Sequence, residues 1–439
     1  MKFQVDRDAL ADALAWVARA LPSRPVVPVL SGLRLEAAGA LTLSCFDYEV
    51  SATAQIEAEV AEPGTVIVPG RLLAEITRSL PALAVEFSTD DEVVHLTCGS
   101  AEFELFTLAA DEYPALPAPP SLVGTVDGGV LSAAISQVGP AASRDDTLPM
   151  LTGVCLDIDD GTLTLAATDR YRLAVRAVPW HPVQPGLRAA ALVPVRTLAD
   201  AARAMAPGVP VAIAFDTGPA AEPARPRGGD AEPRPAEGMI SFAIGGRRLT
   251  TRLIGGEFIR YRSRFPAEFG GRADVPGSLF TDAVRRVSLV ADRASPVRLR
   301  FSPGSVLIEA QTEGRARAVE TVPAEFHGAE PAIAFNPHYL LDGLTAALVP
   351  TPALPARGDD PPDPPDRRSA PRPDKPAEED AAQVAGPELV RIEFTSPAKP
   401  ALITRAPAPG GEGEPLIEDL RAVPDFRYLV VPLRAVARP

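Results

Sequence analysis

Three ordered sequence patterns each occur three times along the chain, at a spacing of roughly 120 residues. The first pattern is an amphipathic helix, in which apolar residues recur on one face. Its copies are Val5-Asp6 with Leu10, Leu14 and Val17, then Val126-Asp127 with Leu131, Ile135 and Val138, then Val275-Pro276 with Phe280, Val284 and Val287. Asp6, Asp127 and Pro276 stand where a capping residue or a first-turn proline favours a helix start. The repeat restricts the chain to folds built from three similar units.

The second pattern predicts a β-hairpin after each of these helices. Apolar and polar residues alternate on both sides of a glycine turn, which is typical of paired strands. The copies are Pro28-Val29-Leu30-Ser31-Gly32 leading to Gly39–Leu43 and Asp47, and Pro149-Met150-Leu151-Thr152-Gly153 leading to Gly161–Leu165 and Asp169. A third copy, Pro296–Phe301 to Gly304–Ile308, keeps the alternation but matches less closely.

The third pattern predicts a second helix in each unit. It reads Val68-Pro69-Gly70-Arg71-Leu72-Leu73, Val193-Pro194-Val195-Arg196-Thr197-Leu198 and Asn336-Pro337-His338-Tyr339-Leu340-Leu341. Proline is expected at the first turn, because its missing N–H has no partner there in any case. Arg71 and Arg78 are two helical turns apart, as are Arg196 and Arg203, so each pair lies on one helix face. Such arginines can contact phosphates, or they can pair with Glu75 and Asp200 on a solvated face.

These patterns predict three α+β domains, each of two helices with antiparallel strands, over residues 1–120, 121–267 and 268–439. Three Pro-, Ala- and charge-rich insertions interrupt the second and third domains, at 217–238, 350–388 and 406–424. Segments of this composition bury too little apolar surface to offset the entropy of ordering, so we expect disorder there.

Bulk composition favours a soluble cytoplasmic protein. The sequence has no apolar run of membrane-spanning length, and its start lacks the apolar stretch of a signal peptide. Its three cysteines, Cys45, Cys98 and Cys155, are too few for a disulfide framework, and Cys155 is expected in the core. The net charge of −14 argues against nucleic acid only if the charges are evenly spread. Nearly all the basic residues are arginines, which composition of the genome explains as readily as function.

No catalytic constellation is visible, and we expect neither a metal nor a cofactor. The four histidines lack metal-ligand spacing, and no glycine-rich phosphate loop follows a strand. Asp157, Asp159 and Asp160 form a carboxylate cluster before Gly161, which is interpreted as a solvated turn. An enzyme on a repeated scaffold, with metal at that cluster, is the alternative from a different functional class.

Several motifs together resemble the bacterial DNA sliding clamps, the β subunits of replicative DNA polymerases. They are Met1-Lys2-Phe3, Arg24-Pro25 with Pro28-Val29-Leu30, Ala167–Val175, Phe335–Asp342 and the terminal Tyr428–Arg434. The resemblance covers the chain outside the three insertions. It implies a non-catalytic ring, formed head to tail by two chains of three domains each, with helices lining a pore and sheets outside. Such a ring slides on duplex DNA without sequence preference and is a processivity factor.

The resemblance also implies which residues bind. Those facing DNA are Arg24, Arg71, Arg78, Arg144, Met150, Arg196 and Arg203. The third domain has no arginine that matches Arg71 or Arg78, which leaves Arg285 or Arg286 to contribute there. DNA polymerase, the clamp loader and repair proteins dock through short motifs in a pocket walled by Leu151, Thr168, Arg170, Tyr171, Arg172, Leu173, Asn336, Tyr339, Ala398, Pro400, Val430, Val431, Pro432, Leu433 and Arg434. The dimer interface joins Phe103 and Leu105 of one subunit to Leu289 and Val290 of the other.

The chain departs from this pattern in the segment Gly256–Arg264. Ile259 stands where a proline is expected, and Ser263 stands in place of an arginine. The chain also continues past Arg434 to Pro439, and the insertion at 350–388 lies in the domain that completes the pocket. A non-replicative clamp paralogue with altered or lost partner binding is therefore the alternative within the same family.

Overall fold

The computed structural model describes residues 1–90, 92–216, 238–292, 295–312, 314–350, 388–406 and 426–433. Apart from their end residues, the predicted insertions lie outside this range, so their disorder stays a prediction. The chain divides into two compact units, Met1–Ala267 with Pro415–Tyr428, and Glu268–Glu414 with Leu429–Pro439. The first unit contains two of the repeats and the second unit contains the third.

The first repeat contains two helices that pack on each other and on strands. Its helices are α1 (Arg7–Val17) and α2 (Gly70–Ser79), with 3₁₀ turns η1 (Ala18–Ala20), η2 (Pro28–Ser31) and η3 (Ala110–Glu112). Its strands are β1 (Lys2–Val5), β2 (Gly32–Ala37), β3 (Leu41–Phe46), β4 (Val50–Ile56), β5 (Glu59–Glu62), β6 (Gly64–Pro69), β7 (Val85–Asp90), β8 (Val93–Cys98) and β9 (Ala101–Phe106).

The second repeat has the same order of elements. Its helices are α3 (Gly128–Val138) and α4 (Val195–Ala202), with 3₁₀ turns η4 (Gly139–Ala141), η5 (Pro149–Leu151) and η6 (Arg262–Arg264). Its strands are β10 (Leu122–Asp127), β11 (Gly153–Asp159), β12 (Thr162–Thr168), β13 (Arg172–Pro179), β14 (His181–Pro182), β15 (Arg188–Pro194), β16 (Pro210–Phe215), β17 (Met239–Ile244) and β18 (Arg247–Arg252).

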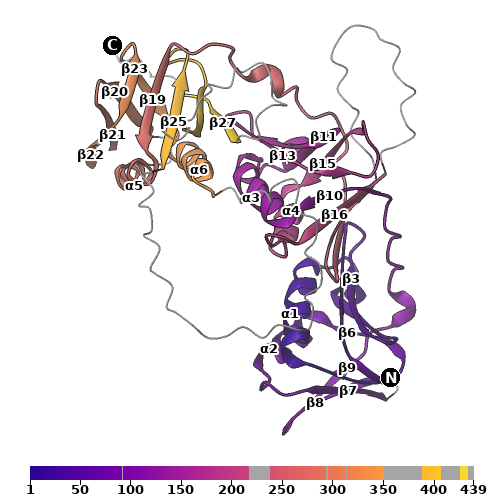
Figure 1. The fold of residues 1–439 in the computed structure, drawn as a ribbon. Helices are drawn as coiled ribbons and strands as arrows, with labels where there is room; N and C mark the ends of the chain where they lie inside the picture. Colours follow the sequence, from indigo (N-terminus) through magenta and orange to yellow (C-terminus); the bar gives the residue numbers. More distant parts are fainter. Residues whose placement is uncertain are drawn as a thin grey trace, which may run out of the picture. The chain divides into compact units, whose positions relative to one another are not determined.

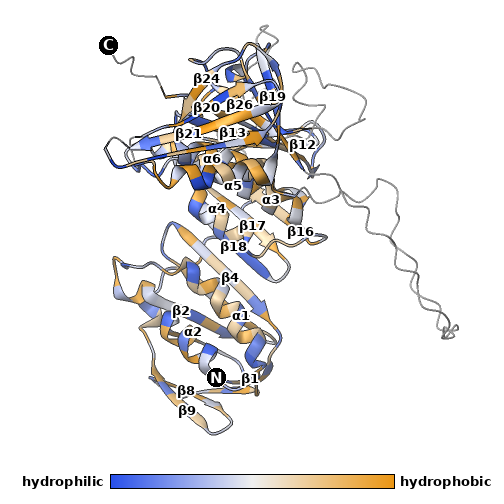
Figure 2. Ribbon diagram, turned by 90° about the vertical axis from the view of Figure 1, so that its left-hand side faces the viewer, coloured by the Kyte–Doolittle hydropathy of each residue, from blue (hydrophilic) through white to orange (hydrophobic). Residues whose placement is uncertain are grey.

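One continuous sheet joins these two repeats. Its strand order is β14-β10-β16-β17-β18-β4-β3-β2-β6, and the junction is the antiparallel pair β18 and β4, in which Leu249 lies opposite Ala52. Figure 2 shows β18 and β4 side by side at this junction. A second sheet of the unit has the order β5-β1-β7-β8-β9, and β15-β11-β12-β13 pair in a third. Helices α1 to α4 all lie on the same side of the long sheet (Figure 1).

The second unit repeats the helix pair and its strands. Its helices are α5 (Gly277–Ser288) and α6 (Pro337–Ala347), which pack together. Its strands are β19 (Gly271–Pro276), β20 (Val297–Ser302), β21 (Ser305–Thr312), β22 (Ala316–Pro323), β23 (Glu325–Gly328), β24 (Ala332–Phe335), β25 (Leu389–Phe394) and β26 (Ala401–Arg405). They pair in the orders β22-β21-β20-β24 and β26-β25-β19-β23. The last strand, β27 (Phe426–Val430), is divided between the units after Tyr428.

The predicted helix faces and hairpins are confirmed. Leu10 and Leu14 of α1, Leu131 of α3 and Phe280 of α5 are fully buried, and β2–β3, β11–β12 and β20–β21 form antiparallel hairpins. Gly304, with φ 81°, follows Pro303 in the last of these turns, where a left-handed residue is required. Cys155 is buried, as expected. None of the helices that the structure describes is long and apolar enough to span a membrane.

The helix starts differ in one respect from the sequence prediction. Asp6 and Asp127 cap α1 and α3 by accepting the N–H groups of Ala9 and Val130. Pro69 and Pro194 also occupy the N-cap position, not the first helical turn. Each is the last residue of a strand, β6 or β15, and its extended backbone lets the strand pass directly into the helix.

Candidate functional site

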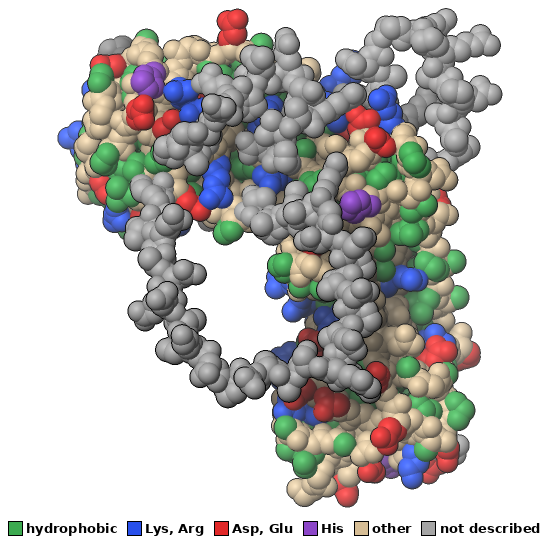
Figure 3. All heavy atoms as spheres, in the orientation of Figure 1, with side chains coloured by type: hydrophobic (Ala, Val, Ile, Leu, Met, Phe, Trp, Pro, Cys, Tyr) green, Lys and Arg blue, Asp and Glu red, His purple; other side chains and the backbone are tan. Residues whose placement is uncertain are grey.

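Two exposed pairs of arginines lie on the helix side of the first unit. Arg71 and Arg78 belong to the first and last turns of α2, while Arg196 lies in the first turn of α4 and Arg203 caps its end. All four side chains are exposed. Figure 3 shows Lys and Arg side chains along the edge of this unit that carries α1, α3 and α4, with acidic side chains beside them. The two helices that carry the predicted cations, α2 and α4, lie on the same side of the long sheet (Figure 1).

The alternative explanation, that these arginines pair along their own helices, is only partly realised. Within the described residues neither Arg71 with Glu75 nor Arg196 with Asp200 forms an ion pair. Arg71 instead donates from Nη2 to the carbonyl oxygen of Leu21 at 2.8 Å. Arg203 is 3.6 Å from the Asp200 carboxylate, and an exposed pair of this kind contributes about 0–1 kcal/mol. Such weak pairing leaves the guanidinium groups able to exchange partners.

Two exposed loops carry the remaining predicted DNA contacts. Arg24 lies between η1 and η2, and Arg144 lies between η4 and η5, the same place in the next repeat. Met150, in η5, is 39% exposed. In the second loop the Thr147 hydroxyl and N–H donate to Asp145, which lowers the pKa of that carboxyl. The second loop thus carries a fixed negative charge next to Arg144.

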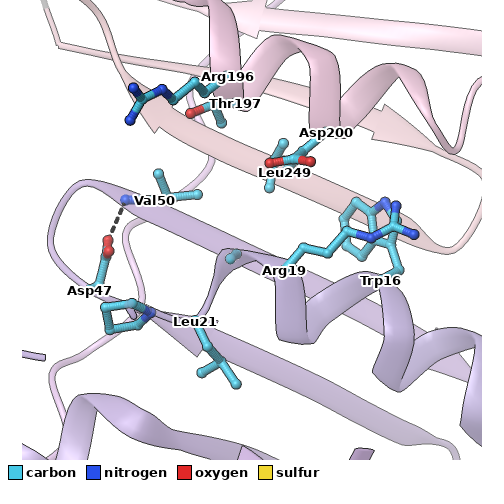
Figure 4. Close-up of a pocket in the computed structure, with 11 residues that line it drawn as sticks. Trp16, Arg19, Leu21, Asp47, Val50, Arg196, Thr197, Asp200 and Leu249 are labelled. Atoms are coloured by element: carbon cyan, nitrogen blue, oxygen red, sulfur yellow. Dashed lines mark hydrogen bonds between the residues drawn. The ribbon is translucent and has the colours of Figure 1, made fainter. Parts of the chain in front are cut away.

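A cavity of about 210 Å³ opens on the helix side where the two repeats meet. Figure 4 shows Arg19 of η1 and Arg196 of α4 among its lining residues, with Asp47 and Asp200. Among the described residues neither Arg19 nor Arg196 has a carboxylate within ion-pair distance. Arg19 is not among the predicted contacts, because it follows the last turn of its helix and the other two copies of that helix have no arginine at this place.

Two further arginines form contacts between the two repeats. The Arg247 guanidinium pairs with Asp12 of α1 and lies over the ring of Trp16, 5.9 Å from its centroid. Arg252 donates from Nε to the carbonyl oxygen of Tyr48 at 2.9 Å. Together with the β18–β4 ladder, these contacts hold the arginines of α2 and α4 on one rigid surface.

The first unit supplies one wall of the predicted docking pocket, a tight loop between β12 and β13. Asp169 accepts the N–H groups of Tyr171 and Arg172 on Oδ1 and the Arg172 Nε on Oδ2, all at 3.0 Å. Thr168 donates from its hydroxyl to the Arg172 carbonyl oxygen at 2.5 Å. This capping leaves Tyr171 51% exposed, while Arg172 is buried. Leu151 and Leu173 are 5% exposed, so they support the loop more than they offer surface.

The same loop occurs in the first repeat. Asp47 accepts the N–H groups of Glu49 and Val50, which follow it by two and three residues. Asp169 accepts the N–H groups at the same two positions after itself. Tyr48, with φ 73°, and Arg170, with φ 80°, both adopt the left-handed region, which is strained for side chains other than glycine. The carboxylate cap therefore sets the loop geometry, and the exposed side chains determine what each loop can contact.

The second unit supplies the other predicted wall residues. The side-chain oxygen of Asn336 is engaged, because Oδ1 caps α6 by accepting the N–H groups of His338 and Tyr339. Ala398 is exposed in the turn before β26, and Pro400 is partly exposed. In the tail, Val430 and Pro432 are buried, Val431 is partly exposed and Leu433 is 40% exposed. The Leu433 N–H donates to the Ala334 carbonyl oxygen, and Arg434 lies outside the described residues.

Two of the predicted dimer contacts lie on an edge strand, where one of them points inward, and the other two lie at the end of α5. β9 is the edge of its five-stranded sheet, and Leu105 on it is 2% exposed, while Phe106 is 72% exposed. Side chains alternate along a strand, so Phe103 and Leu105 share the inner face and Phe106 lies on the other. In the second unit Leu289 is 82% exposed at the end of α5, and Val290 is partly exposed. Of Leu105 and Phe106, Phe106 is therefore the exposed apolar side chain at this end of β9.

The interpretation of Asp157 as part of a solvated turn is wrong. Asp157 lies inside β11 and is buried, and its Oδ2 accepts the Tyr261 hydroxyl and the Arg262 Nη2, both at 2.7 Å. Burial beside Asp157 raises the pKa of the Tyr261 phenol well above its usual range. Only Asp160 lies in the turn, where it accepts the N–H of Gly186. Asp157 thus holds the segment after β18 against the sheet. The described residues contain no group of metal ligands.

Replacing Asp157 with Ala is expected to lower the free energy of unfolding of the first unit by about 2–3 kcal/mol, because the buried Tyr261 hydroxyl loses its acceptor. Arg262 is 39% exposed and can return to water, so it adds little. Asp159 is the matched control, since its pair with the exposed Arg188 contributes about 0–1 kcal/mol. Urea unfolding measures both, and an equal effect of the two substitutions would contradict the assignment.

Three family models match the chain in order. They describe the N-terminal domain of the DNA polymerase III beta subunit over residues 1–117, its central domain over 125–259 and its C-terminal domain over 262–350. A beta sliding clamp of Streptomyces coelicolor is 43% identical over 99% of both chains. A beta sliding clamp of Micrococcus luteus is 43% identical over 74% of this chain and 99% of its own, and a beta sliding clamp homolog of Streptomyces muensis is 42% identical over 79% and 88%.

Solved structures share the fold. The DNA polymerase sliding clamp of Bacillus subtilis superimposes with a TM-score of 0.77 at 23% identity, over 99% of both chains. A sliding clamp of Pseudomonas aeruginosa bound to griselimycin gives a TM-score of 0.77 at 24% identity, also over 99% of both chains.

Proposed function

The chain belongs to the DNA polymerase III beta subunit family, and we propose that it is a sliding clamp, a ring-shaped homodimer that encircles duplex DNA and tethers the replicative polymerase. Arginines at equal positions on α2 and α4, on one face of a rigid two-repeat unit, support this function most directly. Phosphate contacts of this kind release counterions and do not discriminate between sequences. A protein of net charge −14 can then bind DNA, because binding depends on the local charge of these exposed arginines and not on the net charge of the chain.

Ring closure is proposed to occur by head-to-tail pairing of two sheet edges. An unpaired edge strand is a template for addition of another strand, and β9 and β22 are both edges of their sheets. β9 exposes Glu102 and Glu104, and β22 exposes Arg317, which would exchange its partner Glu309 on the neighbouring strand for these carboxylates on closure. Phe106 and Leu289 are the exposed apolar side chains available for the contact. The proposed interface thus uses Phe106 of β9 in place of Leu105, the residue predicted from sequence.

Docking of polymerase, clamp loader and repair proteins is proposed to use the exposed side chains of the two pocket walls. Tyr171 on the β12–β13 loop and Leu433 in the tail offer exposed apolar surface. Aromatic and aliphatic side chains of this kind anchor short peptides when water is excluded around them. Arg170, exposed and next to Tyr171, places a positive charge at the same loop. We place the protein in the cytoplasm with the chromosome, and assign it no catalysis of its own.

Replacing Arg71, Arg78, Arg196 and Arg203 together with Ala is expected to weaken duplex binding at every sequence. Removal of one phosphate contact should reduce the slope of log K against log salt by about 0.9. Fluorescence anisotropy over a salt series measures this slope. Arg248 is the matched control, because it is exposed on β18 and alternates with Arg247, which faces α1. An unchanged slope in the quadruple variant would contradict the assigned DNA face.

Retention on DNA after loading by the cognate clamp loader tests the function as a whole. A working clamp stays on circular duplex and is released when the circle is cut, because the linkage is topological. A dimer that is never loaded would instead favour the paralogue that has left replication, a possibility raised by Ile259 and Ser263 in the segment after β18.

A further inference from the structure

Helices α2, α4 and α6 begin at equivalent positions in the structure, although matching their prolines in the sequence would start α6 one residue later. Their N-cap residues are Pro69, Pro194 and Asn336. Four residues after each N-cap stands a leucine with no exposed surface: Leu73, Leu198 and Leu340. In the sequence, Pro337 aligns with the two earlier prolines, but the structure places it one position later. The third copy is therefore shifted by one residue relative to the sequence alignment.

This shift changes which side chain of α6 corresponds to the proposed DNA contacts. Arg71 and Arg196 stand two residues after their N-caps, and so does His338. All three side chains are exposed. Residues at the same position relative to the cap and the buried leucine project from the same side of each helix. His338 is thus the counterpart of Arg71 and Arg196 in the third repeat.

The charged groups of the elements that pack on α6 are paired with one another. Helix α6 packs on α5 and β26. On α5, Arg285 pairs with Asp282 and Arg286 pairs with Glu320 of β22, both at 2.5 Å, and on β26 Arg405 pairs with Glu388. Asp342, one turn along α6, also has a partner. The His338 imidazole forms no ion pair or hydrogen bond within the described part of the chain, and its backbone N–H alone bonds to Asn336.

We propose that His338 is the phosphate contact of the third domain, and that duplex binding by this clamp therefore strengthens as the pH falls. The inference rests on the proposed clamp function. It assigns to one histidine per subunit the role that arginines fill in the first two domains, in place of Arg285 or Arg286, which are paired.

The expected pH dependence follows from the charge of imidazole. A histidine side chain changes charge between about pH 8 and pH 5, and only its protonated form attracts a phosphate. Binding to DNA then takes up a proton, so affinity is highest where the imidazole is protonated and falls as pH rises. If DNA favours the protonated form by half to one pH unit, affinity changes about threefold to tenfold per contact.

The test compares duplex affinity of the intact ring at pH 6 and pH 8 by anisotropy with a labelled duplex. The wild-type ring carries two such histidines, so it should bind about tenfold to a hundredfold more tightly at pH 6. His338→Gln should lose that difference and bind as weakly at pH 6 as the wild type does at pH 8. His338→Arg should bind tightly at both, with a salt slope at pH 8 that is steeper by about 0.9 per contact. Because the His338 side chain is exposed, we expect the wild type and both variants to fold alike, and thermal melting checks this.

His327 is the matched control, an exposed histidine of the same domain that lies on β23 beside Glu325. His327→Gln should keep the pH dependence of the wild type. If His338→Gln keeps it too, or if His338→Arg leaves the salt slope unchanged, the proposal is overturned. The arginine variants separate this result from failure of the clamp function. If the arginine variants weaken binding at both pH values, the proposed DNA-binding face is supported even if the His338 variants have no effect.

Discussion

Replacing Phe106 with Asp is expected to convert the dimer into monomers and to abolish retention on circular DNA. Phe106 is 72% exposed on the edge strand β9. Burial of a phenylalanine side chain contributes about 1.5–3 kcal/mol, and a ring with two equal interfaces loses that amount twice. The new carboxylate would also lie beside Glu104, which adds repulsion at the same edge. Sedimentation or light scattering would measure the mass, and the loading assay would measure retention.

Two further variants make this result specific. Leu289→Asp, at the end of α5, should have the same effect, because α5 packs on the edge strand β22 and Leu289 is exposed there for the proposed contact. Val183→Asp is the matched control, since Val183 is 55% exposed at a different edge, next to β14. It should leave the dimer intact. A Phe106→Asp protein that remains a dimer would show that ring closure uses another surface.

Replacing Tyr171 with Ala, together with Leu433→Ala, is expected to weaken binding of a docking peptide from the cognate polymerase by about 30- to 1000-fold. Aromatic anchors at the centre of an interface typically contribute about 2–4 kcal/mol, which corresponds to that range. Both side chains are exposed in the free protein, so their removal should cost little stability. Isothermal titration with the peptide gives the affinity, and thermal melting verifies the fold.

The loop of the first repeat provides the control for this experiment. Tyr48 is 49% exposed in a loop with the same capping, at the position of Arg170 and one residue before that of Tyr171, so Tyr48→Ala removes an exposed tyrosine from the corresponding loop of the first repeat. It should leave peptide affinity unchanged. Equal losses of affinity at Tyr48 and Tyr171 would indicate a general effect on the unit. A wild-type protein that binds no partner peptide would instead support the paralogue.

The repeated helices, the hairpins and the arginine pairs could all be predicted from local sequence. These features depend on contacts between residues close in the chain. Asp6 and Asp127 cap helices that begin at the next residue, and Arg71 and Arg78 share a face because a helix repeats every 3.6 residues. Local periodicity is therefore sufficient to place them.

Packing in three dimensions determines which side of a strand is buried and which residues far apart in the chain make contact. Alternation along β9 allowed either Leu105 or Phe106 to face solvent, and packing of the sheet buried Leu105. Asp157 resembles a turn carboxylate in the sequence, but Tyr261 and Arg262, more than a hundred residues later, cover it in the fold. The register of α6 was likewise set by burial of Leu340, which overrides the match between prolines. Each depends on the free energy of burying particular side chains against distant partners, and that information is not present in local sequence.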